Sequence, residues 1–288
     1  MSAIAPERPR RFTRPSPKAL LGLAGTAVIV VYCLAPFYWM AVSAFRRSSD
    51  LFAISALPSP WSLENFGAVM EAKNGFLRAL LNSVIVAGTT TILTLMIATF
   101  TAYALARLEF RGKNLLLAIV IATSMFPTIS LVVPMLKLFT NTLHWVNTYQ
   151  AMIVPSMSFA LPLAVWNLTA FFKQLPRDLE QAAMVDGCTA GQAFRKVILP
   201  LTAPGVFTTA ILTFIMAWNE FVIALSMVNR GSMQTATVAI SRFTGATGFD
   251  VPYGTKMAAG VLVTVPLVIV VLIFQRRIIA GLTAGAVK

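Results

Sequence analysis

Three consecutive residues, Trp218, Asn219 and Glu220, bring together side chains that can bind a polyhydroxylated ligand. The indole offers an apolar face, and the amide and the carboxylate can hydrogen-bond to hydroxyl groups. The three lie in a long apolar run, where a charged group facing lipid costs about 2.5 to 3.5 kcal/mol. We therefore expect Glu220 to face a bundle interior, a partner subunit or water, and the three residues to line a substrate path or form its gate. A structural role, holding helices together, is an equally open alternative.

A second set of candidates lies in the charged segment at 173–203, between two apolar runs. Asp178 and Glu180 suit the first turn of a helix, because the N-terminal end of a helix carries partial positive charge. Gly187 can adopt the left-handed conformation that ends a helix. The segment therefore predicts a short helix that ends near Asp186 and Gly187.

The rest of that segment predicts a second helix. Thr189 and Gln192 have the spacing of a capping box, in which each residue satisfies the other's backbone N–H. One apolar face is expected along this helix, made of Ala190, Phe194, Val197, Ile198 and Leu201. A cytoplasmic protein could bind such a rigid element and move it. A loop lying on lipid headgroups, anchored by Arg195 and Lys196, is the alternative.

Other kinds of functional site find little support in the sequence. His144 is the only histidine and has no companion at ligand spacing, so we predict no metal site. Cys33 and Cys188 fall in segments at different expected depths and should not pair. No Walker A loop is present, so ATP would have to be hydrolysed by another chain. We predict no catalytic residue and no cofactor in this chain.

The composition is that of an integral membrane protein. The 288 residues are 57% hydrophobic and only 11% charged, with a mean hydropathy of +0.77, whereas soluble domains are about 25% charged. Six segments are long enough to cross a bilayer, which takes roughly 20 apolar residues. They cover residues 19–45, 76–105, 115–138, 150–172, 204–228 and 254–274.

The distribution of charge predicts how these spans are oriented. Both tails and the gaps at 106–114 and 173–203 hold 15 of the 23 Lys and Arg residues. The positive-inside rule therefore places both termini and the charged segment in the cytoplasm. The net charge of +13 is spread over these gaps and forms no basic face on a soluble domain, which argues against nucleic-acid binding. The expected organisation is a basic tail at 1–18, a six-helix domain at 19–274 and a second tail at 275–288.

The stretch LEQAAMVDGCTAGQAFRKVILPLTAPG resembles the EAA loop of permease subunits in bacterial ATP-binding cassette (ABC) importers. That pattern runs EAA, then DG or G, then an aromatic residue, then I-x-LP. The family's Glu is Gln181 here, directly after Glu180, so the charged contact of that position is either lost or made by Glu180. The positions that match the pattern are Ala182, Ala183, Asp186, Gly187, Phe194, Ile198, Leu199 and Pro200.

Other stretches are similar to the MalG-type subunit of carbohydrate importers, among them AYALARLEFRGKN, MFP, NTY, WNEF and the terminal GLTAGAVK. The resemblance implies an all-α, polytopic fold of six transmembrane helices, the type I ABC importer permease fold. It implies that the EAA loop is a coupling helix docked on an ATPase. The expected activity is transport of a sugar, such as the disaccharide trehalose, by alternating access.

The partners implied by this resemblance are a MalF-like second permease, a homodimeric ATPase that holds ATP and Mg, and an extracytoplasmic sugar-binding (lipo)protein. The membrane lipid and the sugar complete the set. In the loop at 229–253, Phe249 and Asp250 are expected to contact the binding protein, and residues 281–288 to reach toward the ATPase.

Two rival functions can be weighed against this reading. A secondary transporter working without an ATPase would place its coupling residues within the spans and would not need a cytoplasmic docking element. A membrane-embedded enzyme would need clustered Asp, Glu, His or Ser within the spans. The sequence favours neither, since Glu220 is the only carboxylate deep in a predicted span and no second one pairs with it.

Overall fold

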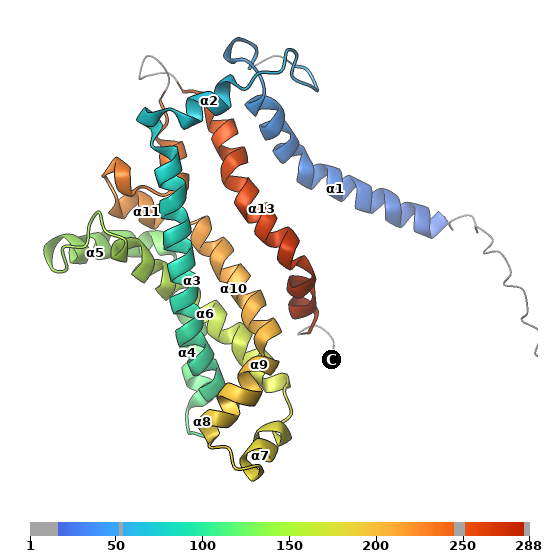
Figure 1. Cartoon of the computed structure of the whole chain (residues 1–288), viewed down its shortest axis with the longest axis vertical. Coiled ribbons are helices and arrows are strands. Elements are labelled where there is room, and N and C mark those ends of the chain that lie inside the picture. The colour runs from blue at the N-terminus through green and yellow to red at the C-terminus, as the bar shows by residue number, and fades with distance from the viewer. Residues whose placement is uncertain (1–16, 52–53, 245–250, 285–288) are drawn as a thin grey trace, which may run out of the picture.

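The structure is a computed structural model that describes residues 17–51, 54–244 and 251–284, and within these ranges all regular structure is helical. Five long helices dominate (Figure 1). They are α1 (Pro17–Ala44), α3 (Phe76–Arg107), α6 (Gln150–Gln174), α10 (Ala203–Trp218) and α13 (Tyr253–Ala284). The predicted all-α class is confirmed.

Shorter helices connect the long ones and mark the two ends of the molecule. At one end, which we call the α2 end, lie α2 (Glu64–Met70), α11 (Val222–Met227) and α12 (Ala236–Ser241). At the other, the α7 end, lie α7 (Asp178–Val185), α8 (Ala190–Ala193) and α9 (Leu199–Leu201). Of the remaining pair, α4 (Lys113–Thr123) runs along the bundle beside α6, and α5 (Thr128–Asn141) turns outward from it (Figure 1).

Helices α3, α6 and α10 form the packed centre of the molecule. Small residues make close packing possible where membrane helices meet, because lipid supplies no hydrophobic driving force between them. Ala98 and Ala102 of α3 and Ala164 of α6 are buried in this way. At Gly205 of α10, an added Cβ would lie 2.4 Å from the ring of Phe171 in α6, so the contact requires glycine.

Two of the six predicted spans are interrupted. Among the described residues, four helices are long and apolar enough to cross a membrane, namely α1, α3, α6 and residues 253–275 of α13, and the total is up to six if each bent pair is one span. The span expected at 115–138 is the α4–α5 pair, bent by 88° at Pro127, whose ring excludes a continuous helix. The span expected at 204–228 divides at Asn219 and Glu220 into α10 and α11. A second bend, of 69°, separates residues 190–201 from α10.

Helix α1 stands apart from the other helices along most of its length (Figure 1). Its most apolar stretch is fully exposed, and it packs on α13 through residues such as Met40, Ala41 and Val261. Within a membrane that apolar surface faces lipid or another chain, because water cannot cover it favourably.

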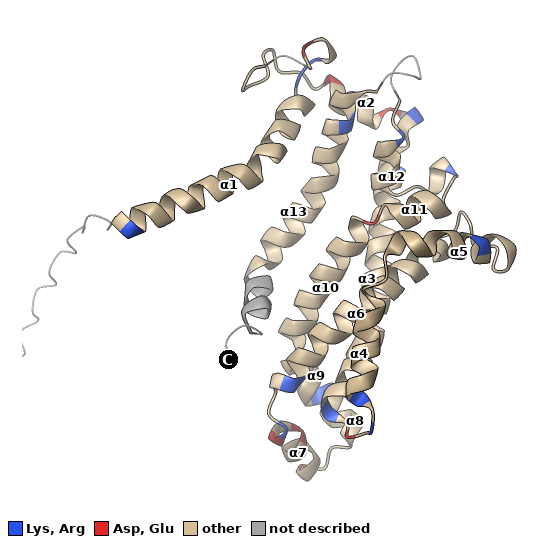
Figure 2. Ribbon diagram, turned by 180° about the vertical axis from the view of Figure 1, so that it is seen from behind, with Lys and Arg blue, Asp and Glu red and all other residues tan. Residues whose placement is uncertain are grey.

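Charged residues gather at the two ends of the bundle and are sparse between them (Figure 2). The α7 end carries seven basic residues, Arg107, Arg111, Lys113, Lys173, Arg177, Arg195 and Lys196. This arrangement fits a bundle whose middle lies in hydrocarbon, where ionised groups are costly.

Candidate functional site

The charged segment folds as the predicted helix, turn and second helix. Helix α7 ends in a Schellman motif centred on Gly187, whose φ is +88°. The N–H of Cys188 donates to the carbonyl of Ala183 at 3.0 Å, and the N–H of Gly187 donates to that of Met184 at 3.1 Å. The helix starts at Asp178 and ends at Val185, as the dipole and glycine arguments predicted.

The predicted capping box is present at the start of α8. The Gln192 N–H donates to Thr189 Oγ1 at 3.3 Å, and the Thr189 N–H donates to Gln192 Oε1 at 2.9 Å. The helix then widens into a π turn over Phe194–Ile198, where the Leu199 N–H donates to the Phe194 carbonyl. Pro200 explains the widening, because it has no N–H for the carbonyl four residues earlier and its ring would crowd that carbonyl.

The apolar face predicted for this helix is partly wrong. Phe194, Val197 and Ile198 do face inward, but Ala190 and Leu201 are exposed. Ala193, which the prediction left out, is fully buried. The prediction assumed 3.6 residues per turn throughout the segment. In a π turn each residue rotates the chain about the helix axis by a smaller angle, so residues after the turn face a different direction from the one predicted.

Helix α7 presents two different faces. On the inner face Ala183 is buried and Glu180 is partly buried. Gln181, Ala182 and Asp186 are exposed on the outer face, and Val185 is 86% exposed. An apolar side chain so fully exposed at the tip of a loop suits contact with another protein.

The inner face is fixed to the end of α3 by residues that the sequence reading did not select. The hydroxyl of Tyr103 donates to Glu180 Oε1, and its ring packs on Phe194 with centroids 4.5 Å apart. One turn later, Arg107 Nη2 donates to the carbonyl of Leu175 at 2.9 Å. Both residues lie in the stretch AYALARLEFRGKN, whose family likeness was noted without a role for either. A tyrosine one turn before an arginine at the end of an apolar helix was the available signal.

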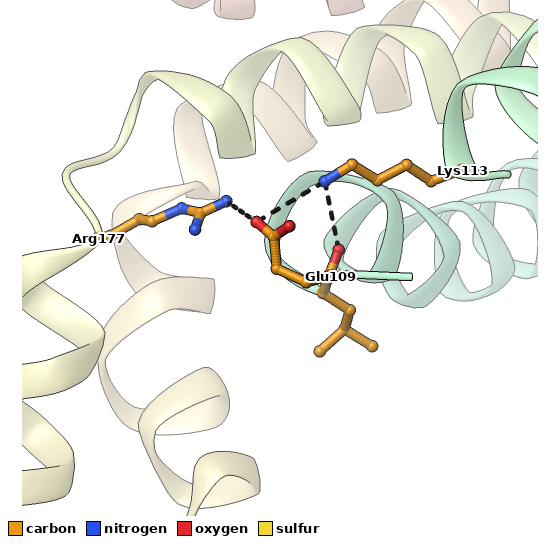
Figure 3. Close-up of polar contacts among 4 residues, drawn as sticks. Glu109, Lys113 and Arg177 are labelled. Atoms are coloured by element: carbon orange, nitrogen blue, oxygen red, sulfur yellow. Dashed lines mark hydrogen bonds and ion pairs between the residues drawn. The ribbon is translucent and has the colours of Figure 1, made fainter. Parts of the chain in front are cut away.

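Figure 3 shows an ion pair at the same end of the molecule. Arg177 Nη2 is 2.8 Å from Glu109 Oε1, and Lys113 Nζ is 3.9 Å from the same oxygen. The hydrogen bond from Arg177, with the charge of Lys113, lowers the pKa of Glu109 below its usual value of 4.5. The pair connects the residues after α3 with those before α7, but its exposure to solvent keeps its contribution small.

The second candidate set, at 218–220, lies at the break between α10 and α11. Glu220 caps α11 with both carboxylate oxygens. Oε1 accepts from the N–H of Ile223 at 2.7 Å, and Oε2 accepts from that of Ala224 at 2.9 Å. Its carbonyl accepts from Thr237 Oγ1 at 3.0 Å, which attaches the break to α12. Glu220 therefore holds the start of α11 in shape and connects the break to α12.

The three residues do not converge on one ligand position. Trp218 is 3% exposed and stacks on Phe214 with centroids 5.5 Å apart. Asn219 is exposed, and its Nδ2 donates to the carbonyl of Ile215. Asn219 and Glu220 line a cavity of about 250 Å³, and Trp218 is not among the lining residues.

This cavity is mixed in character. Thr128 of α5 and Ser156 of α6 contribute hydroxyl groups beside Phe159 and Phe221. Ser156 is 6% exposed, and its Oγ is buried without a hydrogen-bond partner. A buried hydroxyl of this kind is available to a ligand or a water. Sequence reasoning missed Ser156 because one serine in an apolar helix carries no pattern.

Two predicted contact residues, Phe249 and Asp250, lie outside the described residues. Within the described part of the chain, no group of three or more His, Cys, Asp or Glu side chains is placed to hold a metal ion.

A helical bundle of membrane-spanning length, with an exposed helix-turn-helix at one end and a broken helix beside a cavity of mixed polarity, is typical of a transport subunit of the membrane. Residues 94–283 match the profile of the family described as "Binding-protein-dependent transport system inner membrane component", and the chain belongs to this family. It is a permease subunit of an ABC importer, as the EAA-like stretch predicted, and thus a transport component rather than an enzyme.

Curated relatives cover almost the whole chain. The trehalose transport system permease protein SugB of Mycobacterium tuberculosis is 43% identical over 91% of this chain and 94% of its own length. The trehalose/maltose transport system permease protein MalG of Thermococcus litoralis is 42% identical over 94% of this chain and 97% of its own. The expected likeness to MalG-type subunits is confirmed.

Solved structures support the fold. A bacterial ABC transporter involved in the import of the acidic polysaccharide alginate aligns with a TM-score of 0.75, covering 92% of this chain and 99% of that one at 18% identity. ABC importer permeases work with a second permease, an ATPase and a substrate-binding protein, so ATP is handled by a partner chain.

Proposed function

We propose that this chain imports a disaccharide of the trehalose type as one half of a permease pair. The observation that carries the proposal is its identity of 43% and 42% to two permeases named for trehalose transport, over nearly full length in both cases. The other half is a MalF-like permease, and an extracytoplasmic sugar-binding lipoprotein delivers the sugar. A homodimeric ATPase binds ATP and Mg and drives alternating access.

The outer face of α7 is the surface that docks on the ATPase. The exposure of Gln181, Ala182 and Val185 supports this role, as do the Schellman motif and capping box that make the element rigid. The other EAA-like positions contribute from behind, where Phe194 and Ile198 pack inward and Leu199 and Pro200 shape the π turn. Asp186 and Gly187 form the turn itself.

The α7 end faces the cytoplasm, with both termini on that side. The seven basic residues gathered there support this orientation through the positive-inside rule. The segment at 173–203 is then the coupling loop of a single permease domain spanning 19–274, and the tails at 1–18 and 275–288 are cytoplasmic. Residues 281–288 contact the ATPase.

The cavity beside the α10–α11 break lies on the substrate path or its gate. Asn219 and the unpartnered Ser156 hydroxyl are the groups available to sugar hydroxyls. Glu220 maintains the break, and Trp218 supports it from the bundle interior. Phe249 and Asp250, in the loop before α13, contact the binding protein.

Purification of the detergent-solubilised complex tests the proposal. We expect a second permease, an ATPase and a binding protein to accompany this chain, and trehalose with its binding protein to stimulate ATP hydrolysis in liposomes. A chain that purified alone and transported sugar without ATP would instead be a secondary transporter. Stimulation by a different sugar would support the importer function but identify a different substrate.

A further inference from the structure

The hydrogen bond between Tyr103 and Glu180 joins two elements that are 77 residues apart in sequence. Tyr103 lies near the end of α3, and Glu180 lies on the inner face of α7. A tyrosine hydroxyl bonded to a carboxylate is a charge-assisted hydrogen bond, which is about twice as strong as a neutral one. The contact therefore fixes the position of α7 relative to α3.

Aromatic packing holds the tyrosine in place. Its ring lies 4.5 Å from that of Phe194 and meets Phe172 of α6 edge-on at 5.9 Å. Phe172 is fully buried, as is Ile198 behind Phe194. We call Tyr103, Phe172, Glu180 and Phe194 the Tyr103 cluster. Through it one residue of α3 contacts both helical arms of the charged segment, α7 by its hydroxyl and the π turn by its ring.

Helix α3 connects this cluster to the other end of the molecule. It has 32 residues, so it is about 48 Å long. Near its first turns, Asn82 Nδ2 donates to the carbonyl of Gln234 at 2.8 Å, and Ser83 Oγ accepts from the N–H of Ala236 at 2.8 Å. Both contacts hold the segment that leads into α12, and Thr237 of α12 donates to the carbonyl of Glu220. One end of α3 thus contacts the docking element, and the part near its other end is linked to the helix break through residues 234–237.

We propose that Tyr103 is a positioning residue that transmits movement of α7 to α3 and so to the break at Glu220. This inference rests on the proposed docking of α7 on the ATPase. The inference places Glu180 on the inner face of α7, where its carboxylate is bonded to Tyr103. Of these two neighbouring residues, Gln181 is the one on the exposed face. Glu180 therefore does not replace the family's glutamate in the docking contact.

The test is the number of sugar molecules imported per ATP hydrolysed by the reconstituted complex. Tyr103→Phe keeps the ring packing and removes the hydroxyl. We expect about a 5-fold or larger fall in transport per ATP, the lower end of typical coupling between distant sites. Assembly, melting temperature and ATP hydrolysis should stay near those of the wild-type complex, which a merely structural role would not allow.

A double-mutant cycle shows whether the effect belongs to the pair. Tyr103→Phe combined with Glu180→Ala should be no worse than the more severe single variant, because each substitution removes the same hydrogen bond. Arg177→Gln is the matched control. It breaks the exposed ion pair with Glu109 at the same end and should leave transport per ATP unchanged.

Each other outcome is decisive. An unchanged ratio for Tyr103→Phe, or additive effects in the cycle, would overturn the inference and leave the proposed function intact. Loss of assembly in Tyr103→Phe would make the cluster a folding element and also overturn it. If the wild-type chain failed to assemble with any ATPase, the proposed function would fall, and this inference with it.

Discussion

Glu180 and Glu220 are both carboxylates beside short helices, yet their surroundings differ. Glu180 is bonded to the side chain of Tyr103, 77 residues away on another helix. Glu220 is bonded to the backbone of its own segment, at the N–H groups of Ile223 and Ala224. The first contact holds two elements together, whereas the second holds one helix start in shape.

This difference changes what each residue can do for transport. Capping bonds depend on local backbone geometry, so Glu220 maintains a helix break whatever the rest of the bundle does. A side-chain bond between α3 and α7 depends on their relative placement, so it can carry movement from one to the other. Glu220 lines the cavity beside the break, but both of its carboxylate oxygens already accept hydrogen bonds from the backbone.

The largest effect should come from Glu220→Ala. Losing both acceptors leaves two N–H groups unsatisfied at the start of α11, at about 1 to 3 kcal/mol each. We expect sugar uptake to be nearly abolished while the complex still assembles, with a lower melting temperature. Glu220→Gln should be milder because it keeps one acceptor. Ser226→Ala is the control, since that hydroxyl donates to the carbonyl of Val222 within α11 and does not line the cavity. Normal uptake by Glu220→Ala would remove Glu220 from the mechanism.

Next in size should be the effect of a charge on the outer face of α7. Val185→Asp places a carboxylate on the most exposed apolar residue of that helix, and we expect about a 10-fold loss of ATPase affinity, or 1.4 kcal/mol. Binding to the purified ATPase measures it. Glu109→Gln, at the same end but outside α7, should bind normally. Unchanged affinity in Val185→Asp would place the docking contact elsewhere.

A smaller effect should follow from Gly187→Ala. With φ at +88°, an L side chain costs roughly 1 to 2 kcal/mol there, although nothing lies within 4 Å of the added Cβ. Thermal unfolding should show a lower melting temperature, and the reconstituted complex should import less sugar per ATP. Gly191→Ala is matched to it, because that site is equally open but lies in α8 without a positive φ. Equal effects of the two substitutions would mean that the left-handed turn is not the cause.

Gln181→Glu sharpens the contrast between the two faces of α7. The side chain is exposed, so restoring the family's glutamate should change ATPase affinity by at most about 1 kcal/mol. This change in affinity should be smaller in high salt. Transport per ATP in Tyr103→Phe should not recover, since position 181 does not contact α3. Recovery would mean that positions 180 and 181 share one role.

The smallest effect should come from Glu109. Its lowered pKa means that its pairing with Arg177 stabilises the fold above pH 4.5 and that this is lost as pH falls below that value. Thermal melts of wild type and Glu109→Gln should differ slightly at pH 7 and in low salt, and coincide in strongly acidic buffer. A difference that persisted at low pH would show another role for this carboxylate.

Local patterns in the sequence were sufficient for several elements. The Gly187 turn, the Thr189–Gln192 capping box and the long apolar helices each depend on residues close together in the chain. The π turn was missed because Pro200 acts against the regular period that was assumed through it. The 88° bend at Pro127 was missed for a similar reason, since a proline in a membrane helix permits a kink without specifying its angle.

The sequence alone determined that this protein is a helical membrane protein, because apolar length, charge distribution and short-range capping are properties of neighbouring residues, and its resemblance to the EAA loop indicated a permease. Only the tertiary structure decided the partner of Glu180. Tyr103 meets Glu180 because the end of α3 and the inner face of α7 are packed together by Phe172 and Phe194. Contacts between residues far apart in the chain depend on how whole helices pack, and no local pattern encodes that.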